Sequence, residues 1–198
     1  MISILDYGAG NLRSVQNTLD EIGAGYELIR TPEEVRAASK IVLPGVGHFG
    51  QMMRALDAMH VRQPLIERIH SGVPFLGICL GLQALFATSE EAPELSGLGV
   101  FQEKVRRFGD GARVPHMGWN ELVPQRESKL LADIGPSPFV YFAHSYYVPV
   151  VSATAAMCDY TAPYTAALEN GNIFGVQFHP EKSGPLGLRI VRNFVERC

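Results

Sequence analysis

The first 90 residues alternate between short, continuous apolar runs and segments with helical spacing. The apolar runs cover residues 2–5, 26–29, 41–43 and 73–78. Expected helices begin near Leu12 and at Thr31-Pro32, and further ones cover residues 49–59, 64–70 and 82–87. Strands without polar alternation must be covered on both faces, which is typical of a parallel sheet between two layers of helices. The pattern therefore predicts a three-layer α/β fold.

After Glu90 the chain changes to closely spaced strands. Expected strands cover residues 99–105, 139–142, 146–150, 153–157, 165–169 and 172–178, with turns such as Asn170-Gly171 between some of them. A last helix is expected at residues 186–195. The sequence thus predicts a mostly parallel central sheet flanked by helices, with a β-rich second half that is antiparallel in part.

Length and charge narrow the classes of function. A chain of 198 residues fits a single domain, expected at residues 1–198, with a core large enough to be stable without cross-links such as disulfide bonds. A net charge of −3 without a polybasic run disfavours nucleic acids and membrane surfaces as partners. The three cysteines are widely spaced, which favours free thiols and disfavours a disulfide framework or zinc site. We therefore expect no metal and no cofactor. Free thiols and an N-terminus without a basic signal-peptide region predict a cytoplasmic location.

The sharpest local feature is Gly77-Ile78-Cys79-Leu80-Gly81, which follows an apolar strand and opens a helix. This is the nucleophile-elbow pattern G-x-S-x-G with cysteine in place of serine. The turn would expose the thiol at the carboxyl edge of the sheet, and the two glycines would relieve crowding across the turn. The helix start would favour a thiolate, and the Leu80 amide could donate to an oxyanion. An isolated cysteine in an apolar run is more often a core residue, so the hypothesis depends on a base.

His179 and Glu181 are the candidates for a base and its orienting acid. His179 follows an expected strand and could reach the same sheet edge as the thiol. Glu181 lies across Pro180, which restricts the chain so that the carboxylate can be held beside the imidazole ring. A lone His-x-Glu is more often a solvated pair in a loop. His116 and His144, in aromatic segments expected to be loops, remain competing bases.

The segment Pro44-Gly45-Val46-Gly47 follows the strand expected to lie beside the Cys79 strand. A glycine-rich loop at a carboxyl edge can present backbone N–H groups to developing negative charge. Taken alone, this segment is typical of a simple tight turn. Beside an elbow it is a credible second half of an oxyanion hole.

A second glycine-rich segment, Gly8-Ala9-Gly10-Asn11-Leu12-Arg13, also joins a strand to a helix. It has arginine where a dinucleotide-binding fingerprint has its third glycine. The following strand ends in Ile29-Arg30, without the acidic residue that would hold a ribose. A dinucleotide-dependent oxidoreductase is therefore a poor interpretation.

Taken together, the motifs resemble the class I glutamine amidotransferases, which use a Cys-His-Glu triad. The segments that carry the resemblance are residues 44–47, 74–81 and 177–183. Residues 6–12, 114–120 and 141–147 are further similar to one branch of that family, the glutaminase subunits of imidazole glycerol phosphate synthase. These segments follow one another in order along the whole chain. A sister branch, the pyridoxal phosphate synthase glutaminases, resembles Gly-Gly-Glu-Ser where this chain has Pro-Gly-Val-Gly.

The resemblance implies a reaction and a set of roles. Cys79 would attack the side-chain amide of glutamine with help from His179, oriented by Glu181, and a thioester would release ammonia and then glutamate. The implied glutamine-binding residues are Val46, Gly47, Leu80, Gln83, Ser145 and Tyr146, with the amides of Val46 and Leu80 in the oxyanion hole. The implied partner-facing residues are Asn11, Trp119, Tyr141 and Lys182, with Tyr141 near the ammonia exit.

The implied partner is a (β/α)₈-barrel cyclase subunit, in a heterodimer that serves histidine biosynthesis. Members of this branch are nearly idle without the cyclase, and a misdirected amide in residues 44–47 would account for a loss on the order of 3 kcal/mol of transition-state stabilisation. The alternatives are a glutaminase subunit of another ammonia-channelling synthase, a free-standing thiol hydrolase, and a regulatory binding module that kept the fold without the activity.

Overall fold

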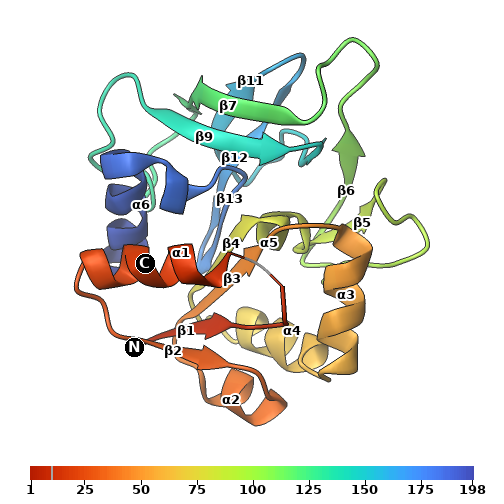
Figure 1. Cartoon of the computed structure of the whole chain (residues 1–198), viewed down its shortest axis with the longest axis vertical. Coiled ribbons are helices and arrows are strands. Elements are labelled where there is room, and N and C mark those ends of the chain that lie inside the picture. The colour runs from red at the N-terminus through yellow and green to blue at the C-terminus, as the bar shows by residue number, and fades with distance from the viewer. Residues whose placement is uncertain (10) are drawn as a thin grey trace.

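The apolar runs of the sequence become strands of one eight-stranded sheet in the computed structural model, which describes residues 1–9 and 11–198. In sheet order the strands are β2 (Tyr26–Ile29), β1 (Ile2–Leu5), β3 (Ile41–Gly45), β4 (Phe75–Cys79), β13 (Ile173–Val176), β12 (Pro163–Asn170), β11 (Thr154–Asp159) and β8 (Val123–Pro124). The strands from β2 to β13 are mutually parallel. The strands β12, β11 and β8 each run antiparallel to the strand before them. Both halves of the predicted sheet are confirmed (Figure 1).

Helices cover both faces of this sheet. They are α1 (Leu12–Glu21), α2 (Pro32–Ala37), α3 (Phe49–Ala58), α4 (Arg62–His70), α5 (Leu80–Gln83), the 3₁₀ turn η1 (Pro180–Lys182) and α6 (Gly184–Arg197). Neighbouring residues of one strand point to opposite faces, so Leu43 packs in a cluster with α3 and α4 while Val42 packs in a cluster with α1 and α6. Figure 1 shows these two helix pairs on opposite sides of the sheet, which confirms the three layers.

Two smaller sheets complete the fold. One joins β5 (Phe86–Ser89), β6 (Phe101–Arg107) and β10 (Tyr146–Tyr147). The other is a ribbon of β7 (His116–Glu121) and β9 (Phe139–His144), which are antiparallel. Val140 and Phe142 of β9 belong to the apolar cluster of α1 and α6, so the ribbon packs on that face. Within the part of the chain that the structure describes, no helix is long and apolar enough to cross a membrane.

The predicted start of α2 at Thr31 is confirmed. The Thr31 hydroxyl accepts a hydrogen bond from the Glu34 amide, and the Glu34 carboxylate accepts one from the Thr31 amide, which is a complete capping box. Pro32 occupies the first turn, where its missing N–H costs nothing.

Two local predictions are wrong. The helix expected at residues 82–87 ends at Gln83, and Phe86 begins strand β5, where its ring stacks on Phe101 at 5.2 Å. His116 and His144 lie on strands β7 and β9, directly opposite each other, and not in loops. In both cases the pairing partner is distant in the sequence, so local periodicity does not reveal it. The strand expected at residues 146–150 is also shorter and ends at Tyr147.

Candidate active site

Three parallel strands end side by side at one edge of the central sheet. Gly45 of β3 pairs with Cys79 of β4, and on the other side of β4, Ile78 pairs with Val176 of β13. The loop at residues 44–47, the cysteine turn and the segment at residues 177–181 therefore leave the sheet together. This convergence was predicted for the carboxyl edge, and the sheet order confirms it.

Cys79 sits on a strained turn between β4 and α5. Its backbone has φ 53° and ψ −105°, a positive φ that L-residues rarely adopt. Such strain persists only where the surroundings enforce it, and it is common at active sites. The side chain is free, and only 6% of the residue is exposed. The geometry is that of a nucleophile elbow.

The two glycines of the elbow are required for different reasons. A Cβ on Gly77 would overlap the backbone carbonyl of Gly81 across the turn, as the sequence predicts. A Cβ on Gly81 would instead overlap the carbonyl oxygen of Leu43 on the neighbouring strand β3. Neither glycine has a positive φ, so close approach and not conformational freedom accounts for both. The prediction that both relieve crowding across the turn is therefore correct for Gly77 only.

The helix behind the cysteine is short. α5 has four residues, so its effect on the sulfur comes from the first amides of the turn and not from a long macrodipole. The Leu80 amide is the first of these. Leu80 also lines the cavity in front of Cys79, as expected for an oxyanion donor.

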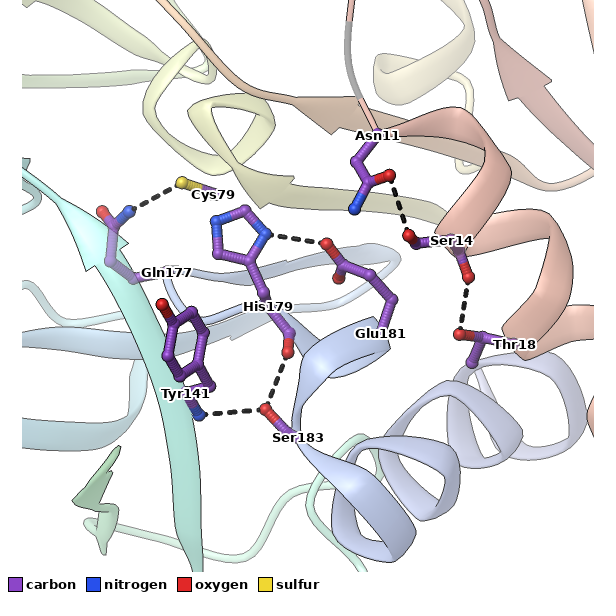
Figure 2. Close-up of polar contacts among 9 residues, drawn as sticks. All are labelled: Asn11, Ser14, Thr18, Cys79, Tyr141, Gln177, His179, Glu181 and Ser183. Carbon is purple, nitrogen blue, oxygen red and sulfur yellow. Dashed lines mark hydrogen bonds and ion pairs between the residues drawn. The ribbon is translucent and has the colours of Figure 1, made fainter. Parts of the chain in front are cut away.

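His179 and Glu181 form a buried ion pair next to the cysteine. His179 Nδ1 lies 2.8 Å from Glu181 Oε1, and their side chains are 4% and 2% exposed. Burial lowers the pKa of His179, but hydrogen bonds to Cys79 and Glu181 outweigh this effect and raise it to about 10. Figure 2 shows the ring between the sulfur and the carboxylate. The arrangement has the order nucleophile, base and orienting acid.

The backbone of His179 is fixed to strand β9. Its N–H donates to the Tyr141 carbonyl at 2.9 Å, and its own carbonyl accepts from the Ser183 hydroxyl at 2.7 Å. The Ser183 oxygen in turn accepts from the Tyr141 N–H at 3.0 Å, as Figure 2 shows. The ring is therefore held by the ribbon as well as by Glu181.

A cavity of about 170 Å³ opens in front of Cys79 and His179. Its walls include every residue expected to hold glutamine: Val46, Gly47, Leu80, Gln83, Ser145 and Tyr146. Glu91, Pro115, Ala143 and His144 also line it, and sequence reasoning assigned no binding role to them. Glu91 follows β5, whose first two residues were expected to end a helix, so no local signal pointed to it.

His116 and His144 do not compete for the role of base. Burial lowers the pKa of His116 to about 4 and that of His144 to about 3, so neither ring would keep a proton taken from the thiol near pH 7. The nitrogens of His144 face the Tyr146 carbonyl at 2.8 Å and the Tyr164 hydroxyl at 3.3 Å. Both ring nitrogens are thus engaged within the protein.

The residues expected to face a partner divide into two places. Trp119 and Tyr141 are paired on the ribbon with ring centroids 6.2 Å apart, and Lys182 Nζ lies 5.7 Å from the centre of the Tyr141 ring. Asn11 stands apart at the start of α1, where its side chain accepts from the Ser14 hydroxyl at 2.8 Å (Figure 2). Gly10, part of the same glycine-rich segment, lies outside the described residues. No metal-binding group of His, Cys, Asp or Glu occurs among the described residues.

Comparison with known proteins gives a consistent set of similarities. The family model "Glutamine amidotransferase class-I" matches residues 3–198. The chain is 47% identical over 196 residues to "Imidazole glycerol phosphate synthase subunit HisH" of Desulfitobacterium hafniense (strain Y51), covering 98% of this chain and 93% of the relative. It is also 47% identical over 197 residues to the subunit of the same name from Methanothermobacter thermautotrophicus, covering 99% of this chain and 98% of the relative.

Solved structures resemble the fold at lower identity. One described as "Crystal structure of glutamine amidotransferase" has a TM-score of 0.77 at 20% identity, covering 98% of this chain and 97% of that chain. "Structure of PurLQS from Thermotoga maritima" has a TM-score of 0.73 at 18% identity, covering 98% of this chain and 96% of that chain. At such identities the likeness shows the architecture alone.

Proposed function

The chain belongs to the class I glutamine amidotransferases, and we propose that Cys79, His179 and Glu181 are the triad with which it hydrolyses the side-chain amide of glutamine. It acts as the glutaminase subunit of imidazole glycerol phosphate synthase in histidine biosynthesis, since relatives of that name are 45% to 47% identical over nearly its whole length. The observation that carries the proposed triad is the cavity in which Cys79 and His179 meet all six residues expected to hold glutamine.

In the first half of the reaction, the Cys79 thiolate attacks the amide carbon of glutamine. The pKa of His179, raised to about 10, keeps the imidazole protonated at neutral pH, so the ring holds the proton that the leaving nitrogen needs. The Leu80 amide stabilises the developing oxyanion. The Val46 amide adds a second hydrogen bond once its N–H points at the cavity. Cleavage of the C–N bond releases ammonia and leaves a thioester on the sulfur.

In the second half, water hydrolyses the thioester. His179 is now neutral and takes a proton from the attacking water, while Glu181 stabilises the imidazolium that forms. The C–S bond then breaks, the electron pair returns to the sulfur, and glutamate leaves. The thiolate–imidazolium pair is thereby restored.

The walls of the cavity suit a free amino acid. Glu91 is the only carboxylate among the described residues that line it, and one of its oxygens is held by the Phe49 amide at 2.7 Å. We expect this fixed carboxylate to bind the α-ammonium group of glutamine. A volume of about 170 Å³ is below the ~300–1,000 Å³ of pockets for larger ligands, which disfavours the alternative of a free-standing peptidase.

The proposed partner is a (β/α)₈-barrel cyclase that receives the ammonia in a one-to-one complex, in the cytoplasm. The outer face of the β7–β9 ribbon supports a docking role, because large apolar side chains are exposed there: Met117 is 64%, Trp119 56% and Phe139 49% exposed. Tyr141 pairs with Trp119 across the ribbon, and Lys182 Nζ lies 5.7 Å from the centre of the Tyr141 ring. We also propose that residues 1–198 form a single domain, which the family match over residues 3–198 supports.

Control of the reaction is proposed to act on the oxyanion loop at residues 44–47. Val46 and Gly47 line the cavity, and Gly47 has φ 94°, a conformation that favours glycine. Rotation of the peptide between Gly45 and Val46 changes where the Val46 N–H points without moving the triad. Docking of the cyclase would favour the orientation that faces the oxyanion.

An ammonia-release assay tests the proposed function. The full chain is supplied with glutamine in the presence and absence of a cyclase subunit, and ammonia is measured with and without the Cys79→Ala substitution. We expect strong release only in the wild-type complex, and cyclisation driven by added ammonia should survive Cys79→Ala. Equal release by the isolated chain and the complex would contradict control by the partner. Glutamine-dependent turnover by the Cys79→Ala complex would contradict the proposed triad.

Covalent labelling separates a glutaminase from a general thiol hydrolase. A diazo-ketone analogue of glutamine should modify Cys79, and excess glutamine should protect it. A peptidase should ignore this small mimic. Absence of labelling in the complex would therefore favour the hydrolase alternative.

A further inference from the structure

A fully buried glutamine contacts the proposed nucleophile from the side away from Glu181. Gln177, two residues before His179, has no exposed surface, and its Nε2 lies 3.6 Å from Cys79 Sγ. Its Oε1 lies 3.0 Å from Nε2 of Gln83, which is 3% exposed and lines the cavity. Figure 2 shows the Gln177 amide directed at the sulfur on one side, with the His179 ring on the other.

The orientation of these two amides follows from one backbone carbonyl. The terminal Gln83 atom that contacts Gln177 also lies 2.8 Å from the Tyr146 carbonyl oxygen. A carbonyl oxygen only accepts hydrogen bonds, so the Gln83 atom must be the nitrogen. Its second neighbour must then be the acceptor of Gln177, the oxygen. The Gln177 nitrogen therefore faces Cys79, and the sulfur meets an N–H donor.

The same reasoning fixes what Gln83 offers to a ligand. Both hydrogens of its amide are used, one by the Tyr146 carbonyl and one by Gln177. Its Oε1 accepts no hydrogen bond from the residues that the structure describes. Gln83 can therefore present only an acceptor to the cavity, which matches an ammonium or amide N–H of a substrate.

A donor aimed at the sulfur favours its negatively charged form. An N–H group forms a stronger hydrogen bond to a thiolate than to a thiol, because the acceptor is ionised. The same donor lowers the cost of expelling the thiolate when the C–S bond of the thioester intermediate breaks and the electron pair returns to sulfur. It does so from the side of the sulfur that His179 does not occupy.

We propose that Gln177 is a positioning residue, which holds the Cys79 sulfur as a hydrogen-bonded thiolate and, together with the Tyr146 carbonyl, fixes Gln83 as an acceptor toward the substrate. The role rests on the proposed glutaminase function, but the contact with the sulfur can be tested without glutamine. Gln177 was part of the motif that carried the family resemblance, and sequence reasoning gave it no role. Its burial and its two partners become visible only when β4, α5 and the segment after β13 are brought together.

Alkylation of Cys79 by iodoacetamide provides the test. Gln177→Met keeps the length of the side chain but removes the donor, and Gln177→Leu removes it with a different shape. Modification is read at the Cys79 peptide alone by mass spectrometry, over a series of pH values, in the full chain. We expect both variants to react about tenfold more slowly on the acidic limb of the profile, where the thiolate is the minor form, and at the wild-type rate on the alkaline limb.

Two further readouts separate positioning from general damage. Gln102→Leu removes an exposed amide on β6 that bonds only its own turn, and it should leave the alkylation profile unchanged. In the complex with the cyclase, the Gln177 variants should also raise KM for glutamine, because Gln83 then keeps only one of its two hydrogen bonds, the one to the Tyr146 carbonyl. Wild-type alkylation profiles in both variants would overturn the proposal. Loss of ammonia release on Cys79→Ala tests the glutaminase function separately, since that result does not depend on Gln177.

Discussion

Gly81→Ala should destabilise the protein by several kcal/mol, because the added methyl group has nowhere to go. The new Cβ would overlap the Leu43 carbonyl oxygen, a backbone atom of a central strand that cannot rotate away. Overpacking typically costs about 1–3 kcal/mol, and a rigid obstacle places this substitution at the upper end, about 3 kcal/mol. For a chain of this length each kcal/mol lowers Tm by about 2–4 °C, so we expect a fall of about 6–12 °C.

The assay is thermal unfolding, with glutamine hydrolysis in the complex as a second readout. β3 and α5 must separate to admit the methyl group, and a shift of about 1 Å at the cysteine would cost on the order of 100-fold in turnover. Gly111→Ala is the matched control, because a Cβ there meets no atom within 4 Å and the backbone needs no positive φ. It should leave Tm unchanged or slightly raised. If Gly81→Ala melted within 2 °C of the wild type, the close approach would not be a constraint.

The remaining predictions concern the triad and the docking face. Cys79→Ala should lower the pKa of His179 from about 10, because the sulfur contributes the largest effect that raises it, and an NMR titration of the ring would show this. A His179 pKa above its usual 6.5 stabilises the fold at low pH, so the advantage of the wild type over His179→Asn in free energy of unfolding should shrink as pH rises from 6.5 to 10; a constant difference would contradict the ion pair. Glu181→Gln should reduce glutamine turnover by about 10²–10⁴-fold while ammonia-dependent cyclisation in the complex continues at the wild-type rate. Trp119→Ala should weaken cyclase binding by about 1–2 kcal/mol in a titration, without altering alkylation of Cys79.

Most of the fold could be predicted from local sequence, because apolar runs and helical spacing are patterns within a few neighbouring residues. Continuous apolar runs specify strands buried on both faces, and helical spacing specifies the layers that cover them, so the parallel half of the sheet followed directly. The failures share one cause. The local pattern predicts a helix at Phe86, but the residue lies in a strand because it pairs with β6. His116 likewise lies in a strand because it pairs with His144 of β9. Neither pairing can be predicted from the residues that flank Phe86 or His116 in the sequence.

The candidate site divides in the same way. Residues whose chemistry is written in a motif could be named from the sequence: the cysteine between two glycines, and the histidine and glutamate around a proline. The sequence could not name Glu91, because its role depends on a cavity that six separate segments enclose. It also could not identify Gln177 as a neighbour of the sulfur, because the contact depends on the registry of two strands.

The sequence by itself determined the alternation of strands and helices, the elbow at Cys79 and the residues able to form a triad with it. These features depend on backbone conformation and side-chain chemistry within a few residues. Tertiary structure decided which glycine faces which backbone, which histidine has a raised pKa and which amide donates to the sulfur. Those properties arise from burial and from contacts between distant segments, since a pKa or a hydrogen-bond direction is set by the groups around a side chain and not by its neighbours in the chain.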